Sequence, residues 1–205
     1  MKHVMNVAPG AAVAALAALS IVATAAGVDT PPSRREAQLM RQKIDAITAH
    51  GERTGAPARR TIVTDREVNA YFVFEGKEQL PVGVVTPSVT ILGTGRLAGK
   101  AVVDLDAVRR AKNPTSLLDP MNYLRGRLPV SATGVLKTSK GVGHFELEST
   151  QINGIPIPKL LLQEILSYYS RTPEKPAGLS LDDPFELPAG IREIQVQRGQ
   201  AIIVQ

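Results

Sequence analysis

The side chains best suited to chemistry lie on two polar strand faces. His144, Glu146 and Glu148 alternate along the stretch HFELES, and alternate residues of a strand project from one face about 7 Å apart. Imidazole and carboxylate groups at this spacing could hold a metal ion. Because no second histidine or carboxylate cluster with ligand spacing accompanies them, we expect a solvated strand face and no metal site.

Asp104 and Asp106 form a second candidate pair. Neighbouring carboxylates could serve as a general acid and a general base. They follow the polar alternation of a predicted strand near Lys100, so we expect solvent-exposed charges. The chain also has no Gly-x-Ser-x-Gly elbow and no cysteine nucleophile. We therefore expect no catalytic residues, no cofactor and no enzymatic activity.

The chain begins with the parts of a secretory signal peptide. Lys2 and His3 form a short basic start, an apolar run follows, and Ala23-Thr24-Ala25 matches a small-x-small cleavage pattern. We predict a signal peptide over residues 1–26 and an exported protein, periplasmic or extracellular, that is soluble after cleavage. An uncleaved N-terminal anchor is the alternative, although the apolar run is shorter than the ~20 residues of a transmembrane helix.

Composition narrows the classes of partner. An exported chain without cysteine has no disulfide framework and depends on packing for its stability. Its net charge is +5, and basic pairs such as Arg34-Arg35 and Arg59-Arg60 could meet an anionic membrane surface or an envelope protein. The chain has four Phe, four Tyr and no Trp, without the interleaving of basic and aromatic residues that stacks bases, so we expect no nucleic-acid partner.

An N-terminal helix and a linker are predicted over residues 27–60. Ser33 can cap a helix that runs to about His50. Its apolar residues at helical spacing form one stripe: Met40, Ile44 and Ile47. Because this stripe is thin, we expect a loosely packed or projecting helix. The stretch GERTGAPARR, rich in glycine, proline and arginine, follows as the linker.

A single α+β domain is predicted over residues 61–205. Thr64 and Glu67 match a capping box, which predicts a short core helix. From Leu80 the hydrophobic period changes to two, and three hairpins follow in the chain. We expect a strongly curved antiparallel β-sheet of about five to six strands. Several inward positions are glycine or alanine, which leaves room for close helix packing or for a ligand.

The stretch INGIPIPKLLLQEILSYY predicts an amphipathic helix that the sheet wraps around. Pro158 suits the first helical position, where its missing N–H costs nothing. The helix has a wide apolar face: Leu161, Leu162, Ile165, Leu166, Tyr168 and Tyr169. Burying these side chains would contribute on the order of 10 kcal/mol before entropy. We therefore expect the sheet, or a ligand, to cover this face.

Several short motifs, in this order, resemble a family. Residues 64–71 read Thr-x-x-Glu-x-Asn-x-Tyr, residues 103–106 read Val-Asp-Leu-Asp, and Asn-Gly-Ile-Pro-Ile-Pro leads into an aliphatic helix. Over about residues 61–205 the chain is similar to small exported bacterial proteins of the YpmS-like and LmeA-like kind, which are related to the tubular lipid-binding class. The resemblance implies a bent sheet around a long helix, an apolar groove and lipid binding at the cell envelope.

Two functions remain open from the sequence. In the first, the protein binds a lipid or other apolar ligand in a groove between helix and sheet. The alternative is a non-catalytic structural or interaction module of the cell envelope with a fully packed core. The residues expected to line the groove are Leu136, Phe145, Leu147, Ile155, Leu161, Ile165, Tyr168 and Tyr169.

Overall fold

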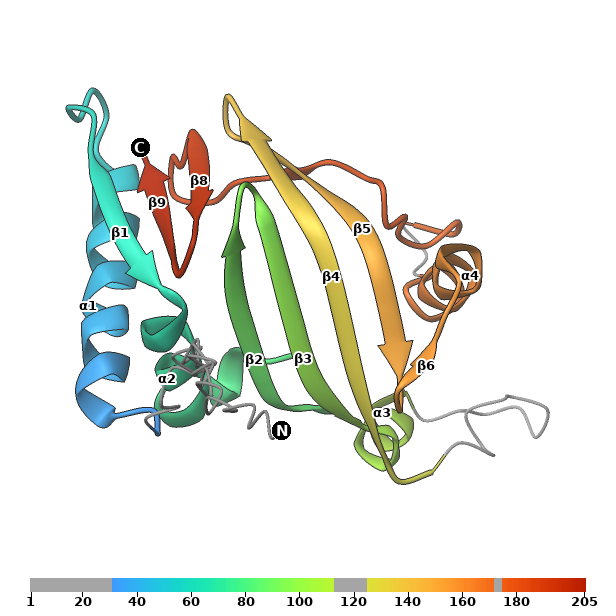
Figure 1. The fold of residues 1–205 in the computed structure, drawn as a ribbon. Helices are drawn as coiled ribbons and strands as arrows, with labels where there is room; N and C mark the ends of the chain where they lie inside the picture. Colours follow the sequence, from blue (N-terminus) through green and yellow to red (C-terminus); the bar gives the residue numbers. More distant parts are fainter. Residues whose placement is uncertain (1–30, 113–124, 172–174) are drawn as a thin grey trace, which may run out of the picture. The chain divides into compact units, whose positions relative to one another are not determined.

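A computed structural model describes residues 31–112, 125–171 and 175–205 (Figure 1). The predicted signal peptide over residues 1–26 lies outside these ranges. The helices are α1 (Arg34–Gly51), α2 (Asp65–Phe74), α3 (Leu105–Lys112) and α4 (Lys159–Tyr169), with a 3₁₀ turn, η1 (Lys77–Gln79). In the described ranges, none of these helices combines the length and the apolar character that crossing a bilayer requires.

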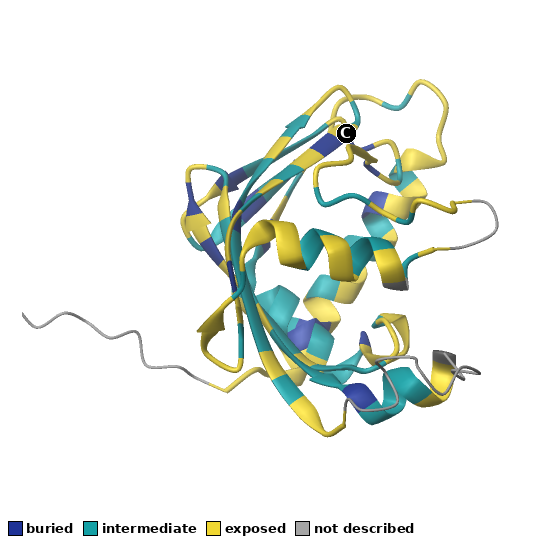
Figure 2. Ribbon diagram, turned by 90° about the vertical axis from the view of Figure 1, so that its right-hand side faces the viewer, coloured by how far each residue is buried: buried dark blue, intermediate teal, exposed yellow. Residues whose placement is uncertain are grey.

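Six antiparallel strands form the large sheet. Its main path runs β2 (Val84–Gly93), β3 (Arg96–Asp104), β4 (Arg127–Ser139), β5 (Val142–Ile152) and β6 (Ile155–Pro156), and β7 (Phe185–Glu186) also pairs with β5. Figure 2 shows this sheet as a bent layer with α4 on its concave side. The α+β class, the curved antiparallel sheet and the N-terminal helix are confirmed.

A second sheet of three strands has the order β1 (Arg60–Thr64), β9 (Gln200–Val204) and β8 (Glu193–Gln197). The β8–β9 hairpin was predicted, but β1 was not, because RTIVT is a short stretch at the end of the expected linker. Hydrogen bonds join the two sheets. The N–H of Gly199 donates to the carbonyl of Ile91 at 2.8 Å, and the N–H of Ile194 donates to the hydroxyl of Thr138 at 2.8 Å.

The core lies where α1, the small sheet and the adjoining end of the large sheet meet. Its buried side chains are Ile47, Val63, Ile91, Leu187, Ile191, Val196, Ala201 and Ile203. The expectation of a loosely packed α1 is therefore wrong. Ala37 is fully buried, Met40 packs against the core, and the ammonium group of Lys43 pairs with Glu67 of α2 at 2.6 Å. A thin stripe is sufficient here because small and charged residues add contacts to it.

Candidate ligand-binding groove

A row of residues with small side chains at its centre crosses the concave face of the large sheet. Register places Val89 of β2 opposite Gly99 of β3, Gly99 opposite Ala132 of β4, and Ala132 opposite Thr150 of β5. We call these four residues the floor row. Glycine and alanine add little height above the backbone, whereas the neighbouring rows carry larger side chains such as Leu97. The row therefore forms a trough across the sheet.

A β-bulge in β5 completes this row. Thr133 lies opposite Ser149 and Gly134 lies opposite Leu147, so Glu148 is an extra residue between them. An extra residue reverses the alternation of side chains beyond it. Thr150 is consequently buried, and Ser149 is exposed. Strict alternation from Phe145 and Leu147 would place Ser149 inward, but the bulge shifts the pattern by one.

The floor row and two helices enclose an apolar groove of about 440 Å³. Phe72 of α2 and Leu162 of α4 stand at its sides, and Ala101, Val130 and Ile152 continue its floor. An adjoining cavity of about 430 Å³ shares Phe72 and Pro87 with the groove. It is otherwise lined by Val73, Lys77, Leu80, Val84, Val85 and Thr86. Both volumes fall within the range of small-molecule sites, about 300–1,000 Å³.

A break in β2 separates the groove from the adjoining cavity. The pairing of β2 with β3 shifts between Val85 and Ser88, and Thr86 within this break has a φ of 46°. Proline is tolerated at such a position because it needs no ladder hydrogen bond there. Pro87 can therefore stand in the wall that both cavities share.

Phe72 is held in place by both ends of α2. At the start, the predicted capping box is present. The N–H of Glu67 donates to the hydroxyl of Thr64 at 3.2 Å, and the N–H of Thr64 donates to the Glu67 carboxylate at 2.9 Å. Beyond its end, the hydroxyl of Tyr71 bonds to Gln79 of η1 at 2.7 Å. The helix is thus fixed beside the groove.

Helix α4 lies beside the edge of the sheet, not over its centre. Pro156 belongs to β6, which pairs with the end of β5, and α4 begins at Lys159 next to that edge (Figure 1). Leu162 faces the groove. On another side, Gln163 accepts from the N–H of Leu181 at 2.7 Å and donates to the carbonyl of Leu179 at 3.1 Å. These bonds tether α4 to the segment that follows it.

Much of the apolar face of α4 is exposed. Leu161 and Ile165, with the neighbouring Leu160, form a surface that we call the outer face, and their exposed fractions are 48%, 39% and 74%. The expectation that the sheet covers the whole apolar face is therefore wrong for Leu161 and Ile165. The physical reason is that α4 begins shortly after β6, at the edge of the sheet. Only one side of the helix therefore faces the floor row.

The predicted groove residues fall into one group on the large sheet and another on or near α4. Leu136 packs against the core, Phe145 lies opposite it in register, and Leu147 lies opposite Gly134. Ile155 is 64% exposed, and Leu161, Ile165 and Tyr168 are also exposed. The side chain of Tyr169 lies outside the described part of the structure. The described members of this set do not line the groove. The lining comes from adjacent rows on the same face of the sheet and, in α4, from Leu162.

The carboxylates considered for chemistry have structural partners. Glu148 pairs with Arg96 at 2.8 Å, and Glu146 pairs with Lys137 at 2.5 Å. Within the described ranges, no three histidine, aspartate or glutamate side chains are grouped as a metal site requires.

Asp104 caps a helix. The predicted strand through Asp106 ends at Asp104, whose carboxylate accepts from the N–H of Ala107 at 2.9 Å at the start of α3. This bond, with the charge of Arg127, lowers the pKa of Asp104. Asp106 accepts from Arg109 and from the N–H of Gly126, each at 3.0 Å. Aspartate is a preferred N-cap residue, so these contacts account for the pair structurally.

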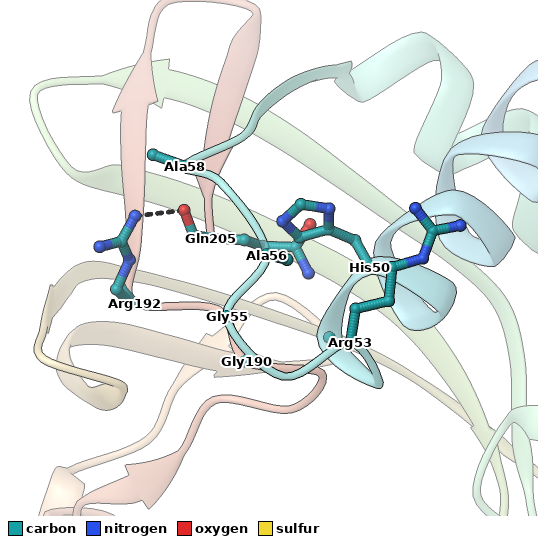
Figure 3. A pocket seen from close by; sticks show the side chains of 9 residues that line it. His50, Arg53, Gly55, Ala56, Ala58, Gly190, Arg192 and Gln205 are labelled. Carbon is teal, nitrogen blue, oxygen red and sulfur yellow. Dashed lines mark hydrogen bonds between the residues drawn. The ribbon is translucent and has the colours of Figure 1, made fainter.

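A separate pocket of about 260 Å³ lies beside the end of α1 (Figure 3). The amide nitrogen of Gln205 donates to the carbonyls of Ile47 at 2.8 Å and Ala189 at 2.7 Å. The guanidinium of Arg192 donates to the backbone oxygen of Gln205, while that of Arg53 points away from Gln205 (Figure 3). These bonds give Gln205 a structural role between α1 and β9.

Comparisons with known proteins include a weak structural likeness. No protein-family model matches the chain, and no curated protein matches it. Among solved structures, the chain is similar to a lipopolysaccharide binding protein with a TM-score of 0.22 and 18% sequence identity, over 71% of this chain and 40% of that one. The chain thus spans less than half of that protein. The resemblance to YpmS-like and LmeA-like proteins stays a prediction, and the site rests on its own geometry.

Proposed function

We propose that the protein binds a lipid or other apolar ligand in the groove between α2, α4 and the large sheet, as an exported protein of the cell envelope. The observation that carries this proposal is the floor row, in which Gly99 and Ala132 leave an open trough under apolar walls. A globular protein gains stability by filling such space with its own side chains. Leaving it open to about 440 Å³ suits a ligand.

The size of the groove favours a long aliphatic chain. Each buried CH₂ contributes about 0.8 kcal/mol, so roughly ten methylenes contribute on the order of 8 kcal/mol. Association costs about 4–15 kcal/mol in lost motion. A short chain therefore binds poorly, whereas a chain that also enters the adjoining cavity gains enough contact to stay bound.

We also propose that this function is binding without catalysis. The walls of the groove and of the adjoining cavity are aliphatic and aromatic side chains, apart from Thr86, Ser88, Ser131, Thr150, Lys77 and Lys100. The carboxylates weighed for acid and base roles cap α3 or form ion pairs away from this lining. The proposal that the groove has no catalytic role is supported by the structural roles of these carboxylates outside the groove.

The outer face of α4 favours a second candidate function, an interaction module of the envelope. Large aliphatic side chains at this exposure lie ready for contact with an envelope protein or an anionic membrane surface. This candidate does not need the groove. Variants of the outer face and of the floor row therefore separate the two functions.

The test is native mass spectrometry of the whole chain expressed with its N-terminal segment in a bacterial host. We expect adducts with the mass of envelope lipids, which organic extraction releases. Ala132→Leu fills the floor row and should abolish the adducts. Ala98→Leu is the matched control, because Ala98 lies opposite Thr90 and Thr133, one residue out of step with the floor row. Lipid-free protein under gentle conditions would contradict the proposal.

A further inference from the structure

We infer that the ligand carries a carbonyl oxygen within reach of Thr150, and that the Thr150 hydroxyl donates a hydrogen bond to it. This inference rests on the proposed function and adds the chemical class of the ligand, an ester-linked or free fatty acid as distinct from a plain hydrocarbon. It also sets the direction in which the chain lies in the groove.

Thr150 is the polar member of the floor row. Its side chain is 9% exposed, and its hydroxyl oxygen has no hydrogen-bond partner among the residues that the structure describes. Its backbone carbonyl, by contrast, accepts from the N–H of Ile157 at 2.9 Å. The hydroxyl is therefore a buried polar group that the folded chain leaves unsatisfied, at the floor of an apolar groove.

The unpaired hydroxyl of Thr150 differs from the hydroxyl of Thr138 on β4, which has hydrogen-bond partners. The hydroxyl of Thr138 donates to the carbonyl of Ile194 at 3.1 Å and accepts from its N–H at 2.8 Å. Buried polar side chains are nearly always paired in this way, and an exception calls for a partner. Thr61 and Gln205 also have an unpaired buried oxygen within the described ranges, but neither lines the groove.

A change of rotamer would present the hydroxyl to the groove. The oxygen itself is covered, while the residue lines the groove. A turn of about 120° about χ1 moves a threonine between staggered rotamers and can bring the hydroxyl to the position that the methyl group occupied. A carbonyl that enters the groove above β5 would then accept the hydroxyl proton, since threonine is both donor and acceptor.

The position of Thr150 orients the ligand. It lies on β5, on the same side of the groove as Ile152 and Leu162, whereas Phe72 and Pro87 stand at the opposite side, next to the adjoining cavity. Strands are spaced by about 4.8 Å, so the floor row crosses about 14 Å from β5 to β2. With its carbonyl at Thr150, an acyl chain extends over Ala132 and Gly99 toward Phe72, and the polar end leaves beside α4.

The test compares methyl dodecanoate with tetradecane, which have similar length, as competitors of a fluorescent apolar probe bound to the whole chain. Thr150→Val removes the hydroxyl and keeps the shape. A single hydrogen bond predicts that this variant binds the ester about three- to tenfold more weakly than the natural sequence does, and that it binds tetradecane equally well. Thr150→Ser should bind the ester as the natural sequence does, and Thr90→Val, one residue out of step with the floor row on β2, is the matched control.

Each outcome is decisive. Weaker ester binding in Thr150→Val with unchanged tetradecane binding supports the inference. Equal ester binding by Thr150→Val and the natural sequence, or an equal loss for both competitors, overturns it and leaves the groove as an apolar site. If the natural sequence binds neither the probe nor the competitors, the proposed function itself falls. Should Thr150→Val fail to fold, Thr150→Ala provides the same comparison of ester with tetradecane.

Discussion

The side-chain amide of Asn69 pairs with both backbone groups of Val89, as a neighbouring strand would. Its nitrogen donates to the carbonyl of Val89 at 2.8 Å, and its oxygen accepts from the N–H of Val89 at 2.7 Å. Val89 lies on β2, at the free edge of the large sheet and in the floor row. Asn69 therefore closes the edge of the sheet and fixes α2, with Phe72, beside the groove.

Asn69→Ala tests this relationship. Two part-buried backbone groups lose their partner, so we expect the free energy of unfolding to fall by about 1–3 kcal/mol. Urea denaturation measures it. Asp65→Asn is the control on the same helix, because the Asp65 carboxylate contacts the N–H of Ile91 at the longer distance of 3.5 Å and its replacement should cost less. Equal losses in the two variants would contradict the role of Asn69.

The ion pair between Lys43 and Glu67 should make stability depend on pH. Burial raises the pKa of Glu67, but hydrogen bonds from Lys43 and from the Thr64 backbone outweigh burial and leave it lowered. A lowered folded-state pKa means that the contribution of Glu67 is complete above the usual glutamate pKa of about 4.3. The contribution is lost as pH falls through the lowered value.

Glu67→Gln should therefore lower stability by about 1.5–3 kcal/mol at neutral pH, because it removes hydrogen bonds to a charged group. The difference from the natural sequence should shrink as the pH falls below 4, measured by thermal denaturation. The exposed pair of Glu146 and Lys137 provides the control, and Glu146→Gln should cost about 0–1 kcal/mol. A difference for Glu67→Gln that is constant with pH would contradict this assignment.

Two glycines of the sheet should respond in opposite ways to alanine. A Cβ at Gly99 would have its nearest neighbour, the carbonyl oxygen of Ser88, at 4.0 Å, whereas a Cβ at Gly134 would lie 2.5 Å from the ring of Phe145. Gly99→Ala should raise stability by about 0.5–1 kcal/mol and weaken binding of long-chain probes. Gly134→Ala should lower stability by about 1–3 kcal/mol. A destabilised Gly99→Ala would show that the floor row is packed, not open.

Two leucines of α4, two positions apart, separate the groove from the outer face. Leu162 lines the groove, and Leu160 belongs to the outer face. Leu162→Ala removes apolar contact with the ligand and should weaken probe binding by about tenfold, equivalent to roughly 1.4 kcal/mol. Leu160→Ala should leave binding unchanged. The reverse pattern in a fluorescence titration would place the ligand on the outer face.

Local patterns in the sequence were sufficient to predict the class of fold. The capping box at Thr64 and Glu67, the period of two in the hairpins and the proline before α4 each depend on neighbouring residues. The small inward residues Gly99 and Ala132 were also visible and indicated room for a ligand. Their joint position was not visible, because register between strands depends on contacts distant in the chain.

The individual site residues were beyond prediction for two physical reasons. The bulge at Glu148 places Thr150 in the floor row, and no local signal marks which residue of HFELESTQ is extra. The position of α4 depends on the pairing of β6 with β5, so the helix presents Leu162 to the groove and leaves Leu161 and Ile165 outside. Phe72, on the helix predicted to lie in the core, lines the groove.

The most direct measurement of the central claim is photo-crosslinking with a fatty acid that carries a diazirine in its chain, followed by peptide mapping of the labelled protein. We predict labels on peptides that contain Gly99, Ala132 and Leu162, and loss of these labels in Ala132→Leu. Labels confined to the peptide of α4, with none on the peptides that contain Gly99 and Ala132, or equal labelling of the natural sequence and Ala132→Leu, would contradict a lipid-binding groove on the floor row.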